Sequence, residues 1–208
     1  MKRFVLMILW LVPFLVKAQD VQIISGNLVD EAIMLDELDS AVVTADAPKL
    51  STLTKKGAKV PGGLMYFSPD DINAELGSIV ETKRSFLVKT ISFKVKKNSL
   101  EGCKANIRIY RLHSVDSLEN IIAIPICQHL PTTPEEATFS IAPQERFVLD
   151  KGKYFISLSI SEMEESAAEA RIYFPLYLKE SYSRRSAKEP LVRRSTNIGL
   201  SVKGIELR

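Results

Sequence analysis

Short segments in which apolar and polar residues alternate are the feature that most constrains the fold of this chain. In residues 86–96, the apolar residues Leu87, Ile91, Phe93 and Val95 alternate with lysine and serine. A period of two with one apolar face is typical of a strand that is buried on one side only. We therefore expect a half-buried β-strand here, with its lysines facing solvent.

The same alternation recurs along the rest of the chain. The inward positions predicted in two further strands are Ala105, Ile107 and Ile109, and Ile156, Leu158 and Ile160. Other short apolar segments follow at close spacing, in residues 120–127, 136–141, 146–150, 170–179 and 197–207. Residues 161–170 fit two helical turns or a polar loop equally well. Many short strands without amphipathic helices predict an all-β fold, an antiparallel sandwich or barrel, and we expect a jelly-roll-like β-sandwich.

The amino-terminal residues have the form of an export signal. A basic start precedes an apolar run of 13 residues, Phe4 to Val16, which the sequence VKA follows. This arrangement is typical of a secretory signal peptide. The alternative, a membrane-spanning helix, needs about 20 apolar residues, and this run is shorter and contains Pro13. We expect residues 1–18 to be removed, so that the mature chain begins at Gln19.

Export predicts a location in the periplasm, at the outer membrane or outside the cell. Contact with a membrane is expected only through an uncleaved signal segment. The formal net charge of +3 does not indicate a nucleic-acid partner, because three of the 28 basic residues lie in the signal sequence and the remainder equals the 25 acidic residues.

Residues 19–63 differ in composition from the rest of the mature chain. From Asp20 to Pro48 there are seven acidic residues and no basic residue, whereas Lys49 to Gly63 is small, basic and interrupted by glycine and proline. The second composition is typical of a linker. We therefore expect an acidic segment and linker over residues 19–63 and a β-sandwich domain over residues 64–208.

Three segments carry a resemblance to a known group of proteins. Residues 77–83, 86–95 and 105–112 have an order and spacing similar to secreted or envelope-located β-sandwich proteins of Bacteroidota, mostly of unknown function. The resemblance covers about residues 66–208 and implies a β-sandwich fold and export. Many of those proteins carry a carboxypeptidase-regulatory-like domain upstream, and residues 35–45 resemble the ending of that domain, although only 16 residues, 19–34, precede that stretch in the expected mature chain.

Reactive side chains are few and form no known catalytic arrangement. Serine and cysteine hydrolases need a nucleophile, a histidine base and an orienting group. The two histidines, His113 and His129, lie beside predicted turns and belong to no metal-binding motif. The adjacent carboxylates Asp70 and Asp71 would point to opposite faces of a strand, whereas glycosidases need two that converge. We expect no catalytic residue, no metal site and no cofactor.

Two cysteines, Cys103 and Cys127, permit one disulfide bridge in an oxidising compartment. If residues 103–112 and 120–127 form a hairpin around Asp116, the cysteines fall within one pairing step of each other. The alternative is two reduced, half-buried thiols, because a slip of one residue turns a side chain to the other face of the sheet.

The carboxy-terminal part offers two candidate surfaces. One is a group of six basic residues. They form either a solvated loop or a patch that faces an acidic partner, such as the chain's own acidic segment. The members of this basic set are Lys179, Arg184, Arg185, Lys188, Arg193 and Arg194. The other is a sugar-binding face lined by Tyr173, Tyr177 and Tyr182, since aromatic rings stack on apolar faces of sugars; the alternative is core and rim positions in the sandwich.

Together these features predict an exported, non-enzymatic β-sandwich module for binding or scaffolding at the bacterial cell envelope. An envelope protein or a glycan is the expected class of partner. The alternatives are a carbohydrate-binding module and a small hydrolase with an unrecognised site.

Overall fold

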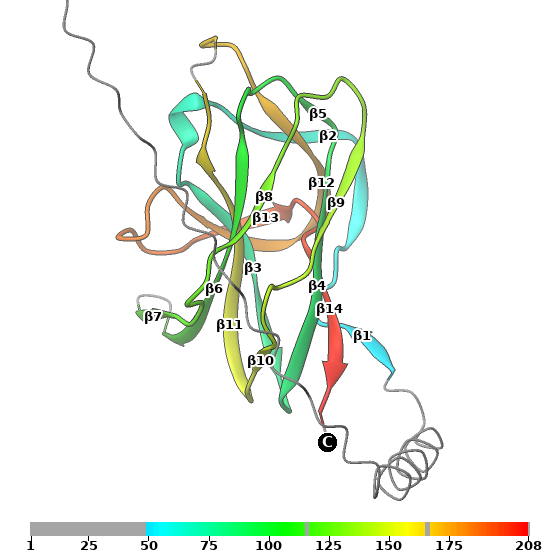
Figure 1. Ribbon diagram of the computed structural model, residues 1–208, viewed down its shortest axis with the longest axis vertical. Coiled ribbons are helices and arrows are strands. Elements are labelled where there is room, and N and C mark those ends of the chain that lie inside the picture. Colours follow the sequence, from blue (N-terminus) through cyan, green and yellow to red (C-terminus); the bar gives the residue numbers. More distant parts are fainter. Residues whose placement is uncertain (1–48, 115–116, 165–166, 208) are drawn as a thin grey trace, which may run out of the picture. The chain divides into compact units, whose positions relative to one another are not determined.

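The computed structural model describes residues 49–114, 117–164 and 167–207 (Figure 1). They form fourteen β-strands and one short 3-10 helix, η1 (Pro69–Asp71), and no α-helix lies among them. The strands make two antiparallel sheets that share one apolar core, so the predicted all-β antiparallel sandwich is confirmed. The jelly-roll topology stays a prediction, and the expected signal peptide and acidic segment lie outside the described residues.

The smaller sheet has five strands and is centred on β4 (Phe86–Val95). Its strand order is β1 (Leu50–Thr52), β14 (Ser201–Glu206), β4 and β10 (Phe147–Leu149), and β9 (Ala137–Ile141) also pairs with β4. β10 and β9 occupy successive parts of the same edge of β4, because Val88 lies opposite Phe147 and Ile91 lies opposite Ile141.

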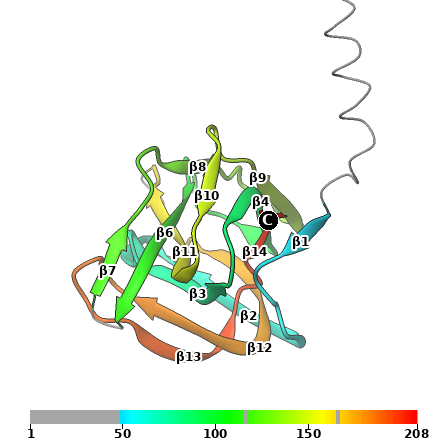
Figure 2. The same ribbon diagram turned by 90° about the horizontal axis from the view of Figure 1, so that it is seen from below.

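The larger sheet has nine strands. Its central order is β13 (Val192–Asn197), β12 (Ile172–Arg184), β3 (Glu75–Thr82), β11 (Gly152–Glu162), β6 (Lys104–Ser114) and β7 (Ser117–Asn120). Three strands extend it: β2 (Ala58–Phe67) and β5 (Lys97–Asn98) pair with β12, and β8 (Ile126–His129) pairs with β6. Figure 2 shows β12 and β13 together at the lower side of that view, beside β2 and β3.

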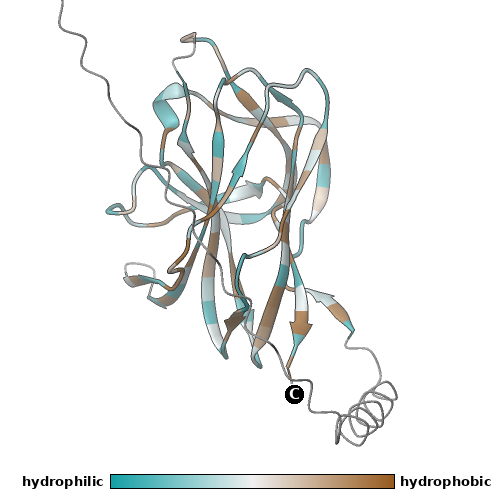
Figure 3. Cartoon of the chain, viewed as in Figure 1, coloured by the Kyte–Doolittle hydropathy of each residue, from teal (hydrophilic) through white to brown (hydrophobic). Residues whose placement is uncertain are grey.

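The central strand β11 has the alternation that the sequence predicts. Ile156, Leu158 and Ile160 are buried in the core, and the neighbouring strand β6 places Ile109 opposite Ile156 and Ile107 opposite Leu158. Figure 3 shows apolar and polar residues alternating along the strands in the same way. Each fully buried aliphatic side chain of this kind contributes about 1.5–3 kcal/mol to the stability of the fold.

The predicted inward position of Leu87 is wrong. Its side chain is half-buried, whereas Phe86 and Val88 are buried in the core. Between Lys203 and Gly204, the pairing of β14 with β4 skips one residue of β4. A β-bulge of this kind leaves one residue unpaired and reverses the alternation beyond it, so the simple period of two fails at the start of β4.

The sheets begin before the expected boundary at Leu64, because some residues expected to be linker form strands. β1 pairs with β14, and β2 pairs with β12 from Ala58 onward. Most side chains of β2 are exposed, so its sequence carries no apolar alternation. Its place in the sheet comes from backbone pairing, and the register shifts near Pro175, opposite the Pro–Gly–Gly stretch of β2. A strand of this kind has the composition of a linker.

The apolar segment 120–127 is not the continuous strand that the sequence suggests. β7 ends at Asn120 and β8 begins at Ile126, and both pair with β6. The intervening loop 121–125 leaves the sheet. Pro125 stands at its end, and proline cannot donate a hydrogen bond to a ladder.

The expected bridge between Cys103 and Cys127 is not formed, and both thiols are free. Cys127 lies opposite Asn106, whereas the Leu130 N–H donates a 2.8 Å hydrogen bond to the carbonyl oxygen of Cys103. The two cysteines therefore differ by three positions in register, an odd number that places them on opposite faces of the sheet. In agreement, Cys103 is buried and Cys127 is exposed.

Candidate functional site

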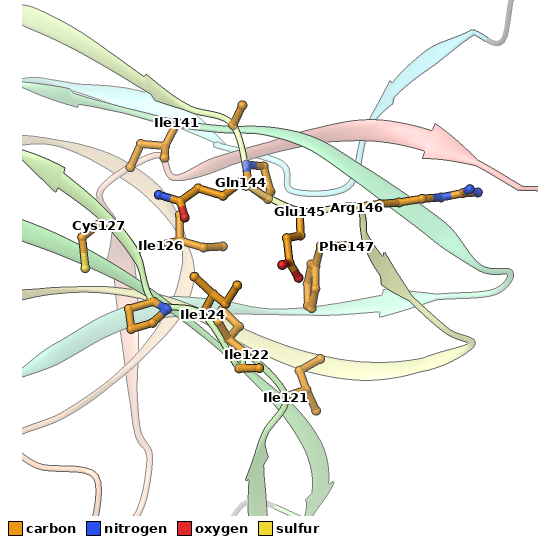
Figure 4. A pocket seen from close by; sticks show the side chains of 14 residues that line it. Ile121, Ile122, Ile124, Ile126, Cys127, Ile141, Gln144, Glu145, Arg146 and Phe147 are labelled. Atoms are coloured by element: carbon orange, nitrogen blue, oxygen red, sulfur yellow. The ribbon is translucent and has the colours of Figure 1, made fainter. Parts of the chain in front are cut away.

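An apolar pocket lies where the loop between β7 and β8 faces the loop between β9 and β10 (Figure 4). It therefore opens at one edge of the sandwich, between a strand of each sheet. Its volume is about 180 Å³. Apolar side chains dominate its wall: Ile121, Ile122, Ile124, Ile126, Ile141 and Phe147.

The loop 121–125 is held in place at its start. The Ile121 N–H donates to the Ile109 carbonyl oxygen at 3.2 Å, and the Ile122 N–H donates to Oδ1 of Asn120 at 3.1 Å. The loop presents consecutive isoleucines to the pocket, and Ile124 remains 41% exposed. A partly exposed apolar wall of this size can bury a group about as large as one aromatic or aliphatic side chain.

Polar side chains line the other side of this pocket. Gln144, Glu145 and Arg146 come from the loop between β9 and β10. The side chains of Gln144 and Glu145 turn toward the apolar wall, whereas that of Arg146 extends away from it (Figure 4). Among the residues that the structure describes, these three side chains make no hydrogen bond or ion pair. An apolar wall with a few unpaired polar groups beside it is typical of a binding site rather than of a closed core.

A buried ionic network lies elsewhere, across four neighbouring strands of the larger sheet. Ser157 stands between core residues of β11, so its side chain points to the outer face of the sheet. Its hydroxyl donates to Oε2 of Glu75 at 3.0 Å, and Tyr110 and Arg108 donate to Oε1 at 2.8 and 3.1 Å. Arg184 Nη2 lies 3.1 Å from both carboxylate oxygens of Glu75.

The surroundings of Tyr110 hold this network together. Its ring stacks on Phe155 with the centroids 6.1 Å apart, and the Arg184 guanidinium carbon lies 4.6 Å from its ring centre. Burial, and then the Glu75 charge, raise the pKa of the Tyr110 hydroxyl. The Glu75 carboxylate accepts hydrogen bonds from four side chains and has no lone pair left for a substrate proton. We therefore interpret Glu75 as a residue that stabilises the packing of the strands, not as a general base.

A second hollow lies beside this network, at the beginning of β3 and the end of β12. Its volume is about 640 Å³, and it shares no lining residue with the apolar pocket. Polar and charged side chains dominate its lining, and the exposed ring of Tyr66 stands at its side.

The structure separates the three tyrosines predicted to form a sugar-binding face. Tyr173 is half-buried and lies 5.9 Å from the ring of Tyr66. Tyr177 is buried, with the backbone of Gly199 close against its ring. The hydroxyl of Tyr182 donates to Oε1 of Glu180 at 2.6 Å. Tyr66 was missed because it lies in β2, which the sequence predicts partly as linker.

The predicted basic set is not one free patch. Arg184 is buried against Glu75, Arg193 forms an ion pair with Glu180, and Arg194 Nε donates to the Ser183 hydroxyl at 2.9 Å. Three of the six predicted basic residues therefore already interact with partners inside the protein.

Both histidines lie on the surface. His113 Nε2 is 3.1 Å from Oε2 of Glu119, and His129 lies in β8 opposite Lys104. Within residues 49–114, 117–164 and 167–207, no three His, Cys, Asp or Glu side chains are placed to hold a metal ion, and no helix is long and apolar enough to cross a membrane.

Comparisons with protein-family models, with curated proteins and with solved structures found no match.

Proposed function

We propose that this protein is a non-enzymatic binding module of the bacterial cell envelope that holds a partner protein by an apolar side chain. The observation that carries the proposal is the apolar pocket at the edge of the sandwich, with the partly exposed Ile124 in its wall. The location rests on the export signal predicted in residues 1–18.

The size of the pocket favours a single anchoring side chain. A volume of about 180 Å³ is too small for most drug-sized ligands. It suits one leucine, methionine or phenylalanine side chain, whose burial contributes about 1.5–3 kcal/mol. Interfaces between proteins commonly depend on a few such anchors in well-packed pockets.

The neighbouring strands favour an extended peptide as the carrier of that side chain. Among the described strands, β8 pairs only with β6 and β9 pairs only with β4, so each leaves one edge of backbone unpaired. A peptide strand can add to such an edge, with its side chains entering pockets beside it. Gln144 and Glu145 stand close enough to the pocket to contact polar groups of that peptide (Figure 4).

Two observations support a binding role over the hydrolase alternative. The buried Glu75 carboxylate is fully engaged by four side chains. His113 and His129 lie apart on β6 and β8, and the first faces a carboxylate on the surface.

The experiment is selection of a phage-displayed random peptide library on the folded protein, followed by binding assays on two matched variants. Ile124→Glu places a charge in the pocket, and Ile72→Glu places the same charge at an isoleucine of nearly equal exposure, 40% against 41%, outside the pocket.

We expect selected peptides to share one large apolar residue and to lose binding about tenfold or more to Ile124→Glu, but not to Ile72→Glu. Peptides without an apolar anchor, or equal binding to both variants, would contradict the proposal.

A further inference from the structure

We infer that the second hollow, beside the Glu75–Arg184 ion pair, binds an uncharged glycan chain with the ring of Tyr66 as its stacking surface. This inference goes beyond the proposed function, because the hollow shares no residue with the apolar pocket. It assigns a second class of ligand to the module.

The charges of the hollow cancel. Three guanidinium groups line it, those of Arg184, Arg185 and Arg194, together with the three carboxylates of Asp71, Glu75 and Glu189. A balanced lining gives neither an anion nor a cation a net electrostatic advantage. The Arg184–Glu75 pair is buried and already satisfied. The remaining two arginines and two acids supply donors and acceptors side by side, and an uncharged polyhydroxylated ligand needs both, because each sugar hydroxyl donates and accepts.

Several of these polar groups are already held in fixed positions. The Asp71 carboxylate accepts from the Ser68 N–H at 2.9 Å and from the Ser68 hydroxyl at 2.6 Å. Arg194 Nε donates to the Ser183 hydroxyl at 2.9 Å, which leaves both of its terminal nitrogens for a ligand. Groups that are ordered before binding lose little conformational entropy when a ligand arrives.

Tyr66 provides the apolar contact that sugar recognition requires. Tyr66 is 55% exposed and lines the side of the hollow. The ring of Tyr173 lies 5.9 Å away at 56°, and the guanidinium carbon of Arg171 lies 5.5 Å from the centre of the Tyr66 ring. These neighbours fix the orientation of an exposed aromatic ring, and such a ring stacks on the C–H face of a pyranose.

The shape favours a chain over a single sugar. The hollow is wide and open, and its volume of about 640 Å³ lies within the range of about 300–1,000 Å³ typical of small-molecule sites. Beyond Tyr173 lies another polar hollow of about 420 Å³, lined by Lys97, Ser99 and Glu169 among others. The pair Tyr66–Tyr173 thus stands between two hollows, and a glycan that crosses this pair can occupy both.

The first test is binding of the purified protein to an array of neutral oligosaccharides. The second is electrophoresis in native gels that contain soluble neutral polysaccharides, namely a mixed-linkage β-glucan, a xylan, a galactomannan, an α-mannan and dextran. Heparin and polygalacturonate are the charged probes. The variants are Tyr66→Ala and Arg194→Ala. The control Tyr182→Ala removes a tyrosine of β12 that does not line the hollow. Thermal melting confirms that each variant is folded.

We expect at least one neutral glycan to bind, with a loss of tenfold or more in Tyr66→Ala, a smaller loss in Arg194→Ala and no change in Tyr182→Ala. Ile124→Glu, which disrupts the apolar pocket, leaves glycan binding intact, so failure of the two proposals is distinguishable. Absence of binding to every neutral glycan overturns the inference. Binding of charged probes alone, or equal binding by Tyr66→Ala and the wild type, overturns it as well.

Discussion

Arg184 Nη2 lies 3.1 Å from both carboxylate oxygens of Glu75, and the two side chains are only 3% and 0% exposed. The residues are directly opposite each other on β12 and β3, although 109 positions separate them in the chain. The pair therefore links β12, near the end of the chain, to β3, which lies near the beginning of the larger sheet in sequence. Both residues also line the second hollow.

Loss of the Glu75 charge is predicted to destabilise the fold strongly. Glu75→Gln leaves the buried Arg184 without its counter-charge, and breaking a buried pair costs about 3–5 kcal/mol in the free energy of unfolding. Chemical denaturation measures this change in the free energy of unfolding. The control is Glu81→Gln, an exposed glutamate on the same strand, with an expected change within about 0.5 kcal/mol. Equal changes in the free energy of unfolding for the two substitutions would contradict the stabilising role of the Glu75–Arg184 pair.

An ion-pair cluster on the smaller sheet predicts a pH dependence of stability. Hydrogen bonds from Lys94 and then Lys96 lower the pKa of Glu136 from 4.5 to about 2. Because the folded pKa is lower than the unfolded one, the stabilisation is present above pH 4.5 and is lost as the pH falls toward 2.

The measurement is the melting temperature of the wild type and of Glu136→Gln between pH 6 and pH 2. We expect the two curves to differ near neutral pH and to converge at the acid end, with a smaller difference in high salt because the cluster is exposed. A difference that stays constant across this range would show that the carboxylate does not titrate as described.

The two free cysteines are predicted to react at different rates. Cys103 is fully buried, and burial raises the pKa of its thiol to about 11, so little thiolate forms at neutral pH. Cys127 is exposed. Mass spectrometry after treatment with iodoacetamide should find one modification on the native protein and two after unfolding without a reductant. A single species that takes up label only after reduction would instead establish the disulfide that the sequence permits.

Substitution of Gly77 by alanine is predicted to destabilise the fold, because the neighbouring backbone lies close to this residue. Substitution of Gly152, which has more space around it, is the control. A β-carbon at Gly77 would clash with the carbonyl oxygen of Ile156, whereas at Gly152 the nearest atom, the Tyr154 hydroxyl, is 3.6 Å away. Gly77→Ala should cost about 1–3 kcal/mol, as overpacking does, and Gly152→Ala less than about 1 kcal/mol. Urea denaturation compares the two, and the reverse order would contradict the described packing around β3.

Alternation along the sequence was enough to predict the fold class and much of the core. It succeeded for Ile156 and Leu158, because a strand in the middle of a sheet with one face on the core repeats with a period of two. It failed at Leu87, where a bulge reverses the period, and in β2, where edge pairing leaves most side chains exposed. A bulge and an edge strand are set by the neighbouring strand, which a local pattern does not contain.

The candidate sites were harder to predict for the same reason. Glu75 and Arg184 meet only because β3 and β12 are neighbours, and no local motif links them. Tyr66 and Tyr173 likewise come together through strand pairing. The apolar pocket did leave one signal, the run of isoleucines that ends at Pro125. A run without alternation beside a proline indicates a segment that leaves its sheet.

Methyl NMR of isoleucine-labelled protein, titrated with a selected peptide, shows whether the apolar pocket binds an extended peptide by one side chain. We expect the methyl signals of Ile122, Ile124 and Ile141 to shift together with a single dissociation constant, and the signal of Ile72 not to move. Alanine at the apolar anchor of the peptide should abolish the shifts. Shifts at Ile72 without shifts at the pocket isoleucines, or shifts that persist without the anchor, would contradict this mode of binding.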